Sequence, residues 1–162
     1  LGWRTTLADP DNRADPDVAA ERDLLRRATS AGGGSWTAAA IATDDLGVAK
    51  AHLVRTALRV RRTNASSFAP GSTYTPLAVA GRGAAHAVGH TMSPAGGGPT
   101  IAVVAVRWST ALRDAGGWGD TLVDLPDGDW RDALSDRRTT HRGRTALAAL
   151  VSDRPGVLLE RV

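Results

Sequence analysis

The chain of 162 residues lacks cysteine and has one phenylalanine, one tyrosine and one lysine, Lys50. Without cysteine it can form no disulfide framework, no thiolate metal site and no cysteine nucleophile, and we expect no redox chemistry. It also lacks a run of the roughly 18 apolar residues that cross a bilayer, and its first residues have neither the charged start nor the apolar stretch of a secretory signal. These absences predict a soluble, cytoplasmic protein without a membrane partner.

The charges are nearly balanced, with 20 Lys and Arg against 17 Asp and Glu and a net charge of +3. The sequence pI near 10.5 is typical of nucleic-acid-binding proteins, because Arg and Lys bind phosphates. However, many arginines alternate with acidic residues, as in Arg131-Asp132. Abundant Arg and Ala with little Lys is also what a GC-rich coding sequence produces. We therefore expect no nucleic-acid partner.

The first part of the chain follows helical spacing, and 42% hydrophobic residues are enough for a core in one or two domains. Residues 16–29 form a predicted helix, for which Asp15 is the expected N-cap and Pro16 suits the first turn. The glycine-rich residues 30–35 end it. Residues 36–43 fit a short helical turn.

A second amphipathic helix is predicted over residues 48–62. Its apolar stripe consists of Val48, Ala51, Val54 and Leu58. Its basic stripe, which we interpret as a solvated face, consists of Arg55, Arg59 and Arg62. The apolar stripe indicates that this helix packs against a larger body.

From residue 74 onward, short apolar runs separated by Gly, Pro, Asp and Ser predict strands. Seven such runs, at a spacing typical of a β-sandwich, cover residues 74–80, 84–92, 100–108, 121–126, 130–135, 145–150 and 156–162. The run 100–108 is apolar on consecutive residues and is expected to be a central strand, whereas 145–150 also fits a helix. The predicted domains are a helical segment, 1–66, and a β-sandwich, 67–162, separated by turn-rich sequence.

The sequence offers few candidates for catalysis or metal binding. The glycines at 32–34 are not followed by the Lys and Ser or Thr of a phosphate loop. His86 and His90 have a metal-ligand spacing for a helix, but in a strand they lie about 13 Å apart. Asp9 and Asn12 have a spacing similar to the start of a calcium loop, but the glycine and the terminal glutamate of such a loop are absent. We predict no metal and no cofactor.

Tryptophan is the main aromatic residue, at positions Trp3, Trp36, Trp108, Trp118 and Trp130. Indole rings stack on sugar rings, but they also fill cores and cover sheet edges. Because the five are scattered among predicted elements, we favour a structural role for each.

Residues 7–25, LADPDNRADPDVAAERDLL, contain the motif Asp-Pro-Asp-Asn-Arg and are followed by further motifs in a fixed order. This order resembles that of the malto-oligosyltrehalose synthases of the α-amylase superfamily. Residues 7–25 are similar to the segment after that family's last barrel strand, and Asp-Pro-Asp-Asn-Arg is the most specific element. Residues 50–68, KAHLVRTALRVRRTNASSF, are similar to its next helix. Four later stretches match strands of its C-terminal β domain in the same order: AHAVGHTM, IAVVAVRW, GWGDTLVDLP and DWRDALSDR. Family members continue the first motif with a second arginine and a proline, where this chain has Ala14 and Asp15.

The resemblance implies an α+β fold, with helices from the end of a (β/α)8 barrel followed by a C-terminal antiparallel β-sandwich. It implies an enzyme that converts the reducing-end α-1,4 bond of a maltodextrin to an α,α-1,1 bond by intramolecular transglycosylation, in trehalose biosynthesis. An Asp nucleophile and a Glu acid and base would act by a retaining mechanism. Both would lie upstream of Leu1, which stands at the start where a complete protein has Met. We expect the chain to be a C-terminal part with no catalytic residue and no activity alone.

Asp9, Asp11, Asn12 and Arg13 are the candidate substrate-binding residues. Loops after barrel strands form the active-site face, where Asp and Asn bind sugar hydroxyls and Arg binds a carboxylate or hydroxyl. The alternative is that this cluster only forms turns before the helix 16–29. The implied partners are a malto-oligosaccharide, bound through the missing barrel, and the upstream catalytic domain.

Two other roles remain open for the β-sandwich. It is either a stand-alone carbohydrate-binding module or a structural cap whose apolar surface covers the barrel. We favour the cap, because the tryptophans are not grouped. The acidic residues of this region are interpreted as turn and strand-edge residues and are Asp124, Asp127, Asp129 and Asp132.

Overall fold

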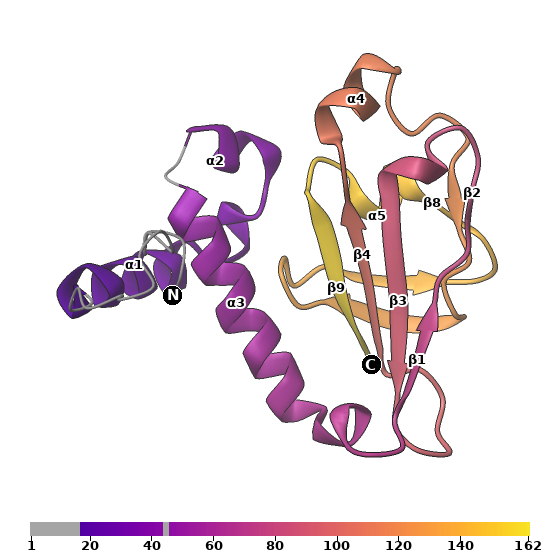
Figure 1. Cartoon of the computed structure of the whole chain (residues 1–162), viewed down its shortest axis with the longest axis horizontal. Coiled ribbons are helices and arrows are strands. Elements are labelled where there is room, and N and C mark those ends of the chain that lie inside the picture. The colour runs from indigo at the N-terminus through magenta and orange to yellow at the C-terminus, as the bar shows by residue number, and fades with distance from the viewer. Residues whose placement is uncertain (1–16, 44–45) are drawn as a thin grey trace, which may run out of the picture.

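The computed structural model describes residues 17–43 and 46–162, in which a helical segment precedes an antiparallel β domain (Figure 1). The helical segment contains α1 (Val18–Ala31), η1 (Gly32–Ser35), α2 (Ala38–Thr43), α3 (Leu46–Thr63) and η2 (Ala65–Phe68). The strands of the β domain are β1 (Thr73–Pro76), β2 (Val79–Ala80), β3 (Ala87–Ser93), β4 (Ile101–Val106), β5 (Leu122–Val123), β6 (Gly128–Asp132), β7 (Arg138–His141), β8 (Thr145–Ala146) and β9 (Gly156–Arg161). Its short helices are η3 (Ala84–His86), α4 (Ser109–Asp114) and α5 (Leu147–Val151).

Helix α1 begins two residues later than the sequence predicted. Its N-cap is Asp17, whose side chain accepts a hydrogen bond of 3.0 Å from the backbone N–H of Ala20. The predicted cap, Asp15, lies outside the described residues. Each Asp of the repeated Asp-Pro-Asp is a good cap, so the sequence alone did not distinguish them. Gly32, with φ of 50°, ends the helix.

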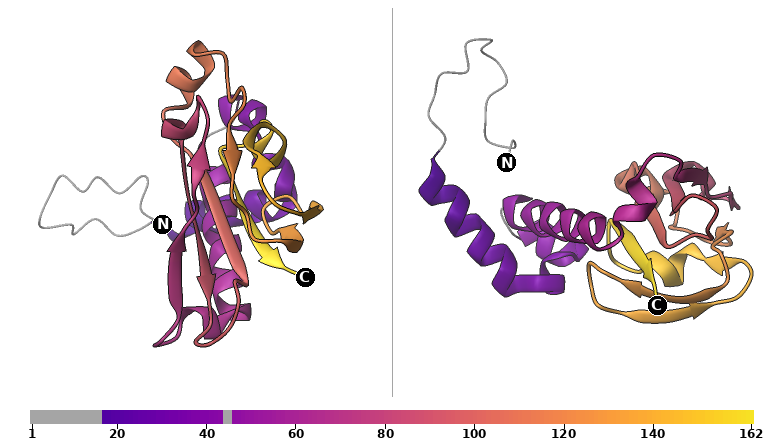
Figure 2. Two further views of the ribbon diagram at one scale, coloured as in Figure 1. Left: turned by 90° about the vertical axis from the view of Figure 1, so that its right-hand side faces the viewer. Right: turned by 90° about the horizontal axis from the view of Figure 1, so that it is seen from below.

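Helix α3 packs on one face of the larger sheet, and α1 lies on the far side of α3 from that sheet (Figures 1 and 2). Between α3 and the sheet is a cluster that contains Val60, Ile101, Leu134 and Leu158 together with Trp36 from the α1–α2 connection. Two polar contacts join the same layers. The indole Nε1 of Trp36 donates to the Gly156 carbonyl at 2.9 Å, and Nε2 of His52 donates to the Leu134 carbonyl at 2.9 Å.

The predicted apolar stripe of α3 divides into two parts. Val48 and Ala51 are buried against α1, where they pack with Ala28. Leu58, by contrast, is 58% exposed. The predicted solvated face of the helix is confirmed, since Arg55, Arg59 and Arg62 are all exposed.

The β domain has a six-stranded sheet of order β1-β3-β4-β9-β6-β7 and a three-stranded sheet of order β2-β5-β8, and all pairs are antiparallel. Strand β4 is central, as its run of apolar residues predicted. Ile101 faces the helical segment, while Ala102 and Val104 face the other layer.

A second core lies on the face of the large sheet opposite α3. It is formed by Trp130, Val157 and Leu159 from the large sheet, with Val123 from the small sheet and Leu147 from α5. The α+β class is therefore confirmed. The small sheet consists of three strands of two residues each, so the second layer is only partly β, and the predicted β-sandwich is not confirmed.

Three elements differ from the strand predictions. The run 145–150 is mostly helix, with β8 covering its first two residues and α5 the rest. Strand β4 ends at Val106, two residues before the predicted end at residue 108, and helix α4, which was not predicted, follows it. Strand β7, RTTH, was not predicted, because an edge strand with a solvated outer face needs no apolar run.

Among the helices of the described residues, none is long and apolar enough to cross a membrane.

The close pairing of β9 with β4 predicts a strong effect at Gly156. A Cβ at this position would lie 2.6 Å from the Val104 carbonyl oxygen, so Gly156→Ala must push the strands apart, at a cost of about 1–3 kcal/mol. The matched control is Gly98→Ala, where nothing lies within 4 Å of the added Cβ. Thermal unfolding followed by circular dichroism should show a Tm several degrees lower for Gly156→Ala and little change for Gly98→Ala. Equal Tm values would contradict the close packing.

Candidate functional site

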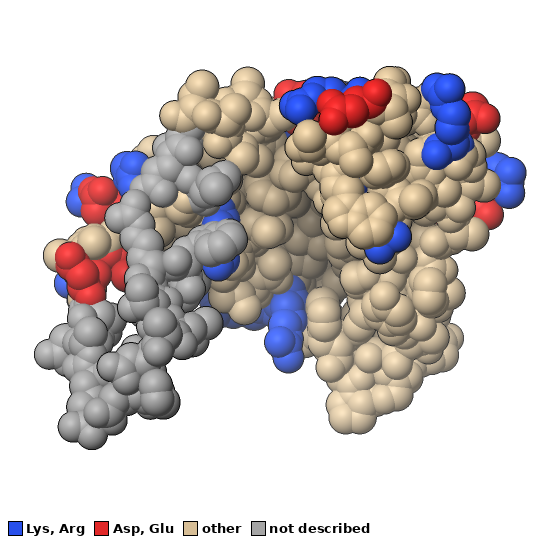
Figure 3. Space-filling view, turned by 45° about the horizontal axis from the view of Figure 1, so that its top comes forward, with Lys and Arg blue, Asp and Glu red and all other residues tan. Residues whose placement is uncertain are grey.

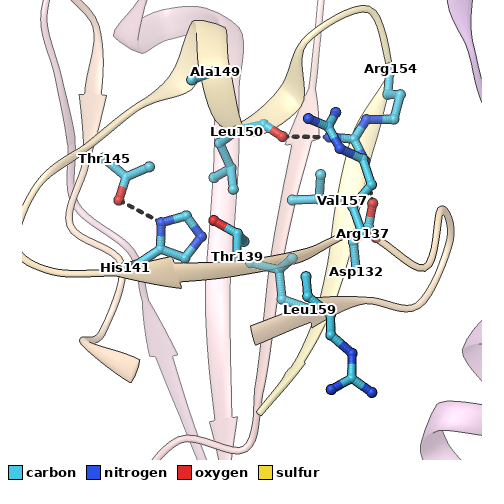
Figure 4. Close-up of a pocket in the computed structure, with 11 residues that line it drawn as sticks. Asp132, Arg137, Thr139, His141, Thr145, Ala149, Leu150, Arg154, Val157 and Leu159 are labelled. Atoms are coloured by element: carbon cyan, nitrogen blue, oxygen red, sulfur yellow. Dashed lines mark hydrogen bonds and ion pairs between the residues drawn. The ribbon is translucent and has the colours of Figure 1, made fainter. Parts of the chain in front are cut away.

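A pocket of about 170 Å³ opens beside the second core, between β6, β7, α5 and β9 (Figure 4). Asp132 and Arg154 lie at one end, and His141 and Thr145 lie at the other. The side chain of Leu150 lies between the two ends. The pocket is lined by three buried polar or charged side chains of the β domain, Asp132, His141 and Arg154, so we consider its chemistry first.

The Asp132 carboxylate is 2% exposed and has several hydrogen-bond donors around it. Its Oδ1 accepts from the backbone N–H groups of Leu134 and Leu158, both at 3.2 Å. Its Oδ2 accepts from the Ser135 hydroxyl at 2.6 Å and from the guanidinium of Arg154. Four donors hold the carboxylate in one orientation.

Arg154 is buried as well, and its donors have protein acceptors. Nε donates to the Val151 carbonyl at 3.0 Å, and Nη2 donates to the Leu150 carbonyl at 2.7 Å. Both carbonyls belong to the end of α5, where a basic side chain satisfies groups that the helix leaves unbonded. Nη1 reaches Asp132 and the Ser135 hydroxyl. This network fixes the fold and leaves no free acid or base for catalysis.

His141 is the group of the pocket with a free polar atom. Its Nδ1 is hydrogen-bonded to the Thr145 hydroxyl at 3.1 Å, and its buried Nε2 has no partner among the described residues. Burial lowers the pKa of His141, because the charged imidazolium is poorly solvated there. The Thr145 hydroxyl is a potential nucleophile, but no carboxylate of the described residues binds the other ring nitrogen to orient the imidazole as in a catalytic triad. No group of three or more potential metal ligands occurs in residues 17–43 and 46–162.

Comparison with known proteins relates the whole chain to one enzyme. The chain is 35% identical over 159 residues, 98% of its length, to a Mycobacterium tuberculosis protein assigned by inference as a maltooligosyl trehalose synthase. It is 34% identical to the maltooligosyltrehalose synthase of Arthrobacter ramosus, whose solved structure matches 99% of the chain with a TM-score of 0.73. Over nearly its whole length, the chain is therefore similar to a part of a maltooligosyltrehalose synthase. It spans 17% of the mycobacterial protein and 19% of the Arthrobacter chain, and no family model matches it.

This similarity directs attention to the residues before α1. Asp9, Asp11, Asn12 and Arg13, the predicted substrate-binding residues, lie outside the described residues. Their part in a maltooligosyltrehalose synthase therefore stays a prediction.

The acidic residues of the β domain have structural roles, as the sequence predicted, but Asp132 does not lie at a turn or strand edge. Asp124 forms an ion pair with Arg144 at 2.9 Å, and Asp127 accepts a hydrogen bond of 2.6 Å from the N–H of Gly143. Asp132 differs, because it is buried at the centre of a network rather than at a strand edge. The sequence did contain a signal for the burial of Asp132. Asp132 is two residues after Trp130, and residues two apart in a strand point to the same face.

The buried pair predicts a large loss of stability on removing one partner. Asp132→Ala should lower the free energy of unfolding by about 3–5 kcal/mol, because it leaves the Arg154 guanidinium buried and unpaired. The control is Asp124→Ala, which breaks an exposed ion pair and should cost at most about 1 kcal/mol. Urea unfolding measures both. Loss of the cooperative transition in Asp132→Ala alone agrees with this expectation, whereas equal midpoints for the two variants would contradict it.

The lowered pKa of His141 predicts a loss of stability in mild acid. The unfolded state binds a proton near the ordinary pKa of about 6.5, while the folded state resists protonation, so stability is complete above that pH and falls as the pH decreases below it. Burial lowers the pKa of His90 in the same way. In His141→Gln, the fall in Tm between about pH 7.5 and pH 5.5 should be smaller than in the unchanged chain, and smaller still with His90→Gln added. An unchanged fall in the double variant would contradict this assignment.

Proposed function

We propose that this chain is the C-terminal part of a maltooligosyltrehalose synthase and acts only together with the catalytic part. The observation that carries the proposal is a single collinear match over 98–99% of the chain, to proteins of which it spans less than a fifth. The helical segment would then come from the end of the (β/α)8 barrel, and the β domain would be the C-terminal domain. The cytoplasmic location expected from the sequence belongs to the same proposal.

The whole enzyme would move one glycosidic bond within a maltodextrin. An Asp displaces the reducing-end glucose from the anomeric carbon of its neighbour while a Glu protonates the leaving oxygen. The released glucose turns and attacks the glycosyl-enzyme through its own anomeric hydroxyl, whose proton the Glu accepts. The new bond is α,α-1,1, and no water is consumed. Neither carboxylate is assigned to a residue of this chain.

The contribution of this chain would be structural, with one contact to substrate. The chemistry of the Figure 4 pocket supports a structural role, because its ion pair is satisfied within the fold. An apolar groove of about 500 Å³ between α3 and the large sheet, lined by Leu58, Phe68 and Met92 among others, offers a surface for the barrel. Asp9, Asp11, Asn12 and Arg13 would bind sugar hydroxyls from the loop before α1.

A chimera tests this proposal. The corresponding fifth of the Arthrobacter synthase is replaced by this chain, and maltohexaose is supplied. We expect loss of reducing ends and formation of trehalose ends by the chimera, and neither by this chain alone nor by the Arthrobacter enzyme without that fifth. In the chimera, Arg13→Ala should reduce turnover with little change in Tm.

Two outcomes would overturn the proposal. Trehalose ends formed by this chain alone would show that the catalytic residues are within it. A folded chimera with no activity would show that this chain cannot replace the corresponding part of a synthase. An equal loss of turnover and of folding in Arg13→Ala would favour the turn-forming role of residues 9–13 over substrate binding.

A further inference from the structure

Trp108 is exposed where the other described tryptophans are buried. Its exposed fraction is 62%, whereas Trp36, Trp118 and Trp130 are each exposed by 9% or less. These three belong to the apolar clusters, so their role in folding is clear. An indole left in water contributes little to folding. The presence of tryptophan at this position therefore calls for a reason outside the core.

The backbone of Trp108 is also in a costly conformation. Its φ of 51° and ψ of 48° lie in the left-handed region, which costs a residue with a Cβ about 1–2 kcal/mol. The chain needs this turn to pass from β4 into α4, whose first hydrogen bond runs from the N–H of Leu112 to the Trp108 carbonyl at 3.0 Å. Glycine or asparagine would make the same turn with less strain. Strain kept at an exposed position is typical of a functional residue.

Neighbouring side chains hold the indole in place. The guanidinium carbon of Arg107 lies 4.3 Å from the centre of the ring, and Arg107 is itself fixed by a hydrogen bond of 2.7 Å from its Nε to the Ala85 carbonyl. The ring of His86 meets the indole edge-on at 6.2 Å. With one face against Arg107 and most of its surface exposed, the ring presents a fixed apolar plane. A ligand would lose little entropy in ordering it.

We propose that Trp108 is a stacking platform for a glucose unit of an α-1,4-glucan, separate from the residues 9–13. The C–H face of a pyranose is apolar and packs flat on the face of the indole that Arg107 leaves uncovered, and the His86 ring at the indole edge can donate an N–H to its hydroxyls. The site goes beyond the proposed function, and only the choice of an α-1,4-glucan rests on it. Such a platform would hold the enzyme on a long chain.

The charges around the site favour a neutral sugar over a nucleic acid, which also stacks on aromatic rings. Arg113, five residues after Trp108, is paired with Asp114 at 3.7 Å. Basic side chains on the β domain lie mostly beside acidic ones on the face shown in Figure 3. Single-stranded nucleic acids need a continuous basic groove as well as stacking.

The test is a titration of the whole 162-residue chain with maltohexaose, followed by the indole and backbone N–H signals in nitrogen-15 NMR spectra. The backbone signals report Kd in the variants that lack the Trp108 indole. The signal of Trp108 is identified by its absence from Trp108→Phe. We expect it to shift and to saturate at millimolar sugar, with Kd raised at least tenfold in Trp108→Asn. Asparagine accepts the left-handed backbone, so this variant should keep the Tm of the unchanged chain. The control is Tyr74→Ala, which removes an aromatic ring that is 57% exposed and should leave Kd unchanged.

Four results would overturn the proposal: no shift of the Trp108 signal, an equal loss of binding in Tyr74→Ala, equal or tighter binding of the β-1,3-linked laminarihexaose, or tighter binding of a single-stranded oligonucleotide. Trp108→Phe keeps a smaller aromatic ring, so it should bind maltohexaose with an affinity between those of the unchanged chain and Trp108→Asn. This graded loss would indicate reduced stacking and not a loss of folding. The chimera experiment scores bond rearrangement and this one scores binding by the chain alone. Each can therefore fail without the other.

Discussion

The buried carboxylate of Asp132 is the constraint on which the rest of the structure depends. It lies at the end of β6 and accepts a backbone N–H from β9, while its other oxygen faces Arg154 in the turn after α5. Asp132 lies between residues of the two cores. Trp130 belongs to the core beside α5, and Ala133 belongs to the core beside α3. A charge placed here with four donors fixes β6, β9 and α5 relative to one another. The large sheet then presents one defined face to α5 and the other to α3.

The helical segment is attached to the same part of the sheet. The indole of Trp36 donates to the carbonyl of Gly156 at the start of β9, and His52 donates to the carbonyl of Leu134 just beyond β6. Val60 adds apolar contact with Ile101 and Leu158. The position of α3 is therefore set by strands that Asp132 holds. If the chain is part of a maltooligosyltrehalose synthase as we propose, this arrangement couples the end of the barrel to the β domain.

The sequence predicted what depends on neighbouring residues and missed what depends on the tertiary fold. The consecutive apolar residues at 100–108 identified the central strand, and spacing identified both long helices. The order of motifs identified the similarity to maltooligosyltrehalose synthases. The polar edge strand β7 had no apolar signal. The pairing of Asp132 with Arg154, 22 residues later, depends on how α5 meets β6. Nothing local distinguishes the exposed Trp108 from the buried Trp130.

The roles of Asp9, Asp11, Asn12 and Arg13 stay predictions, because those residues lie outside the part of the chain that the structure describes.

The central claim is that the helical segment and the large sheet form one cooperative unit joined at β6 and β9. Hydrogen–deuterium exchange of the whole chain, read by mass spectrometry, tests it most directly. Peptides from α3 around His52 and Val60 should exchange as slowly as those from β4 and β9, because both would open only on global unfolding. Exchange of α3 at the rate of an isolated helix, with the sheet still protected, would contradict the claim.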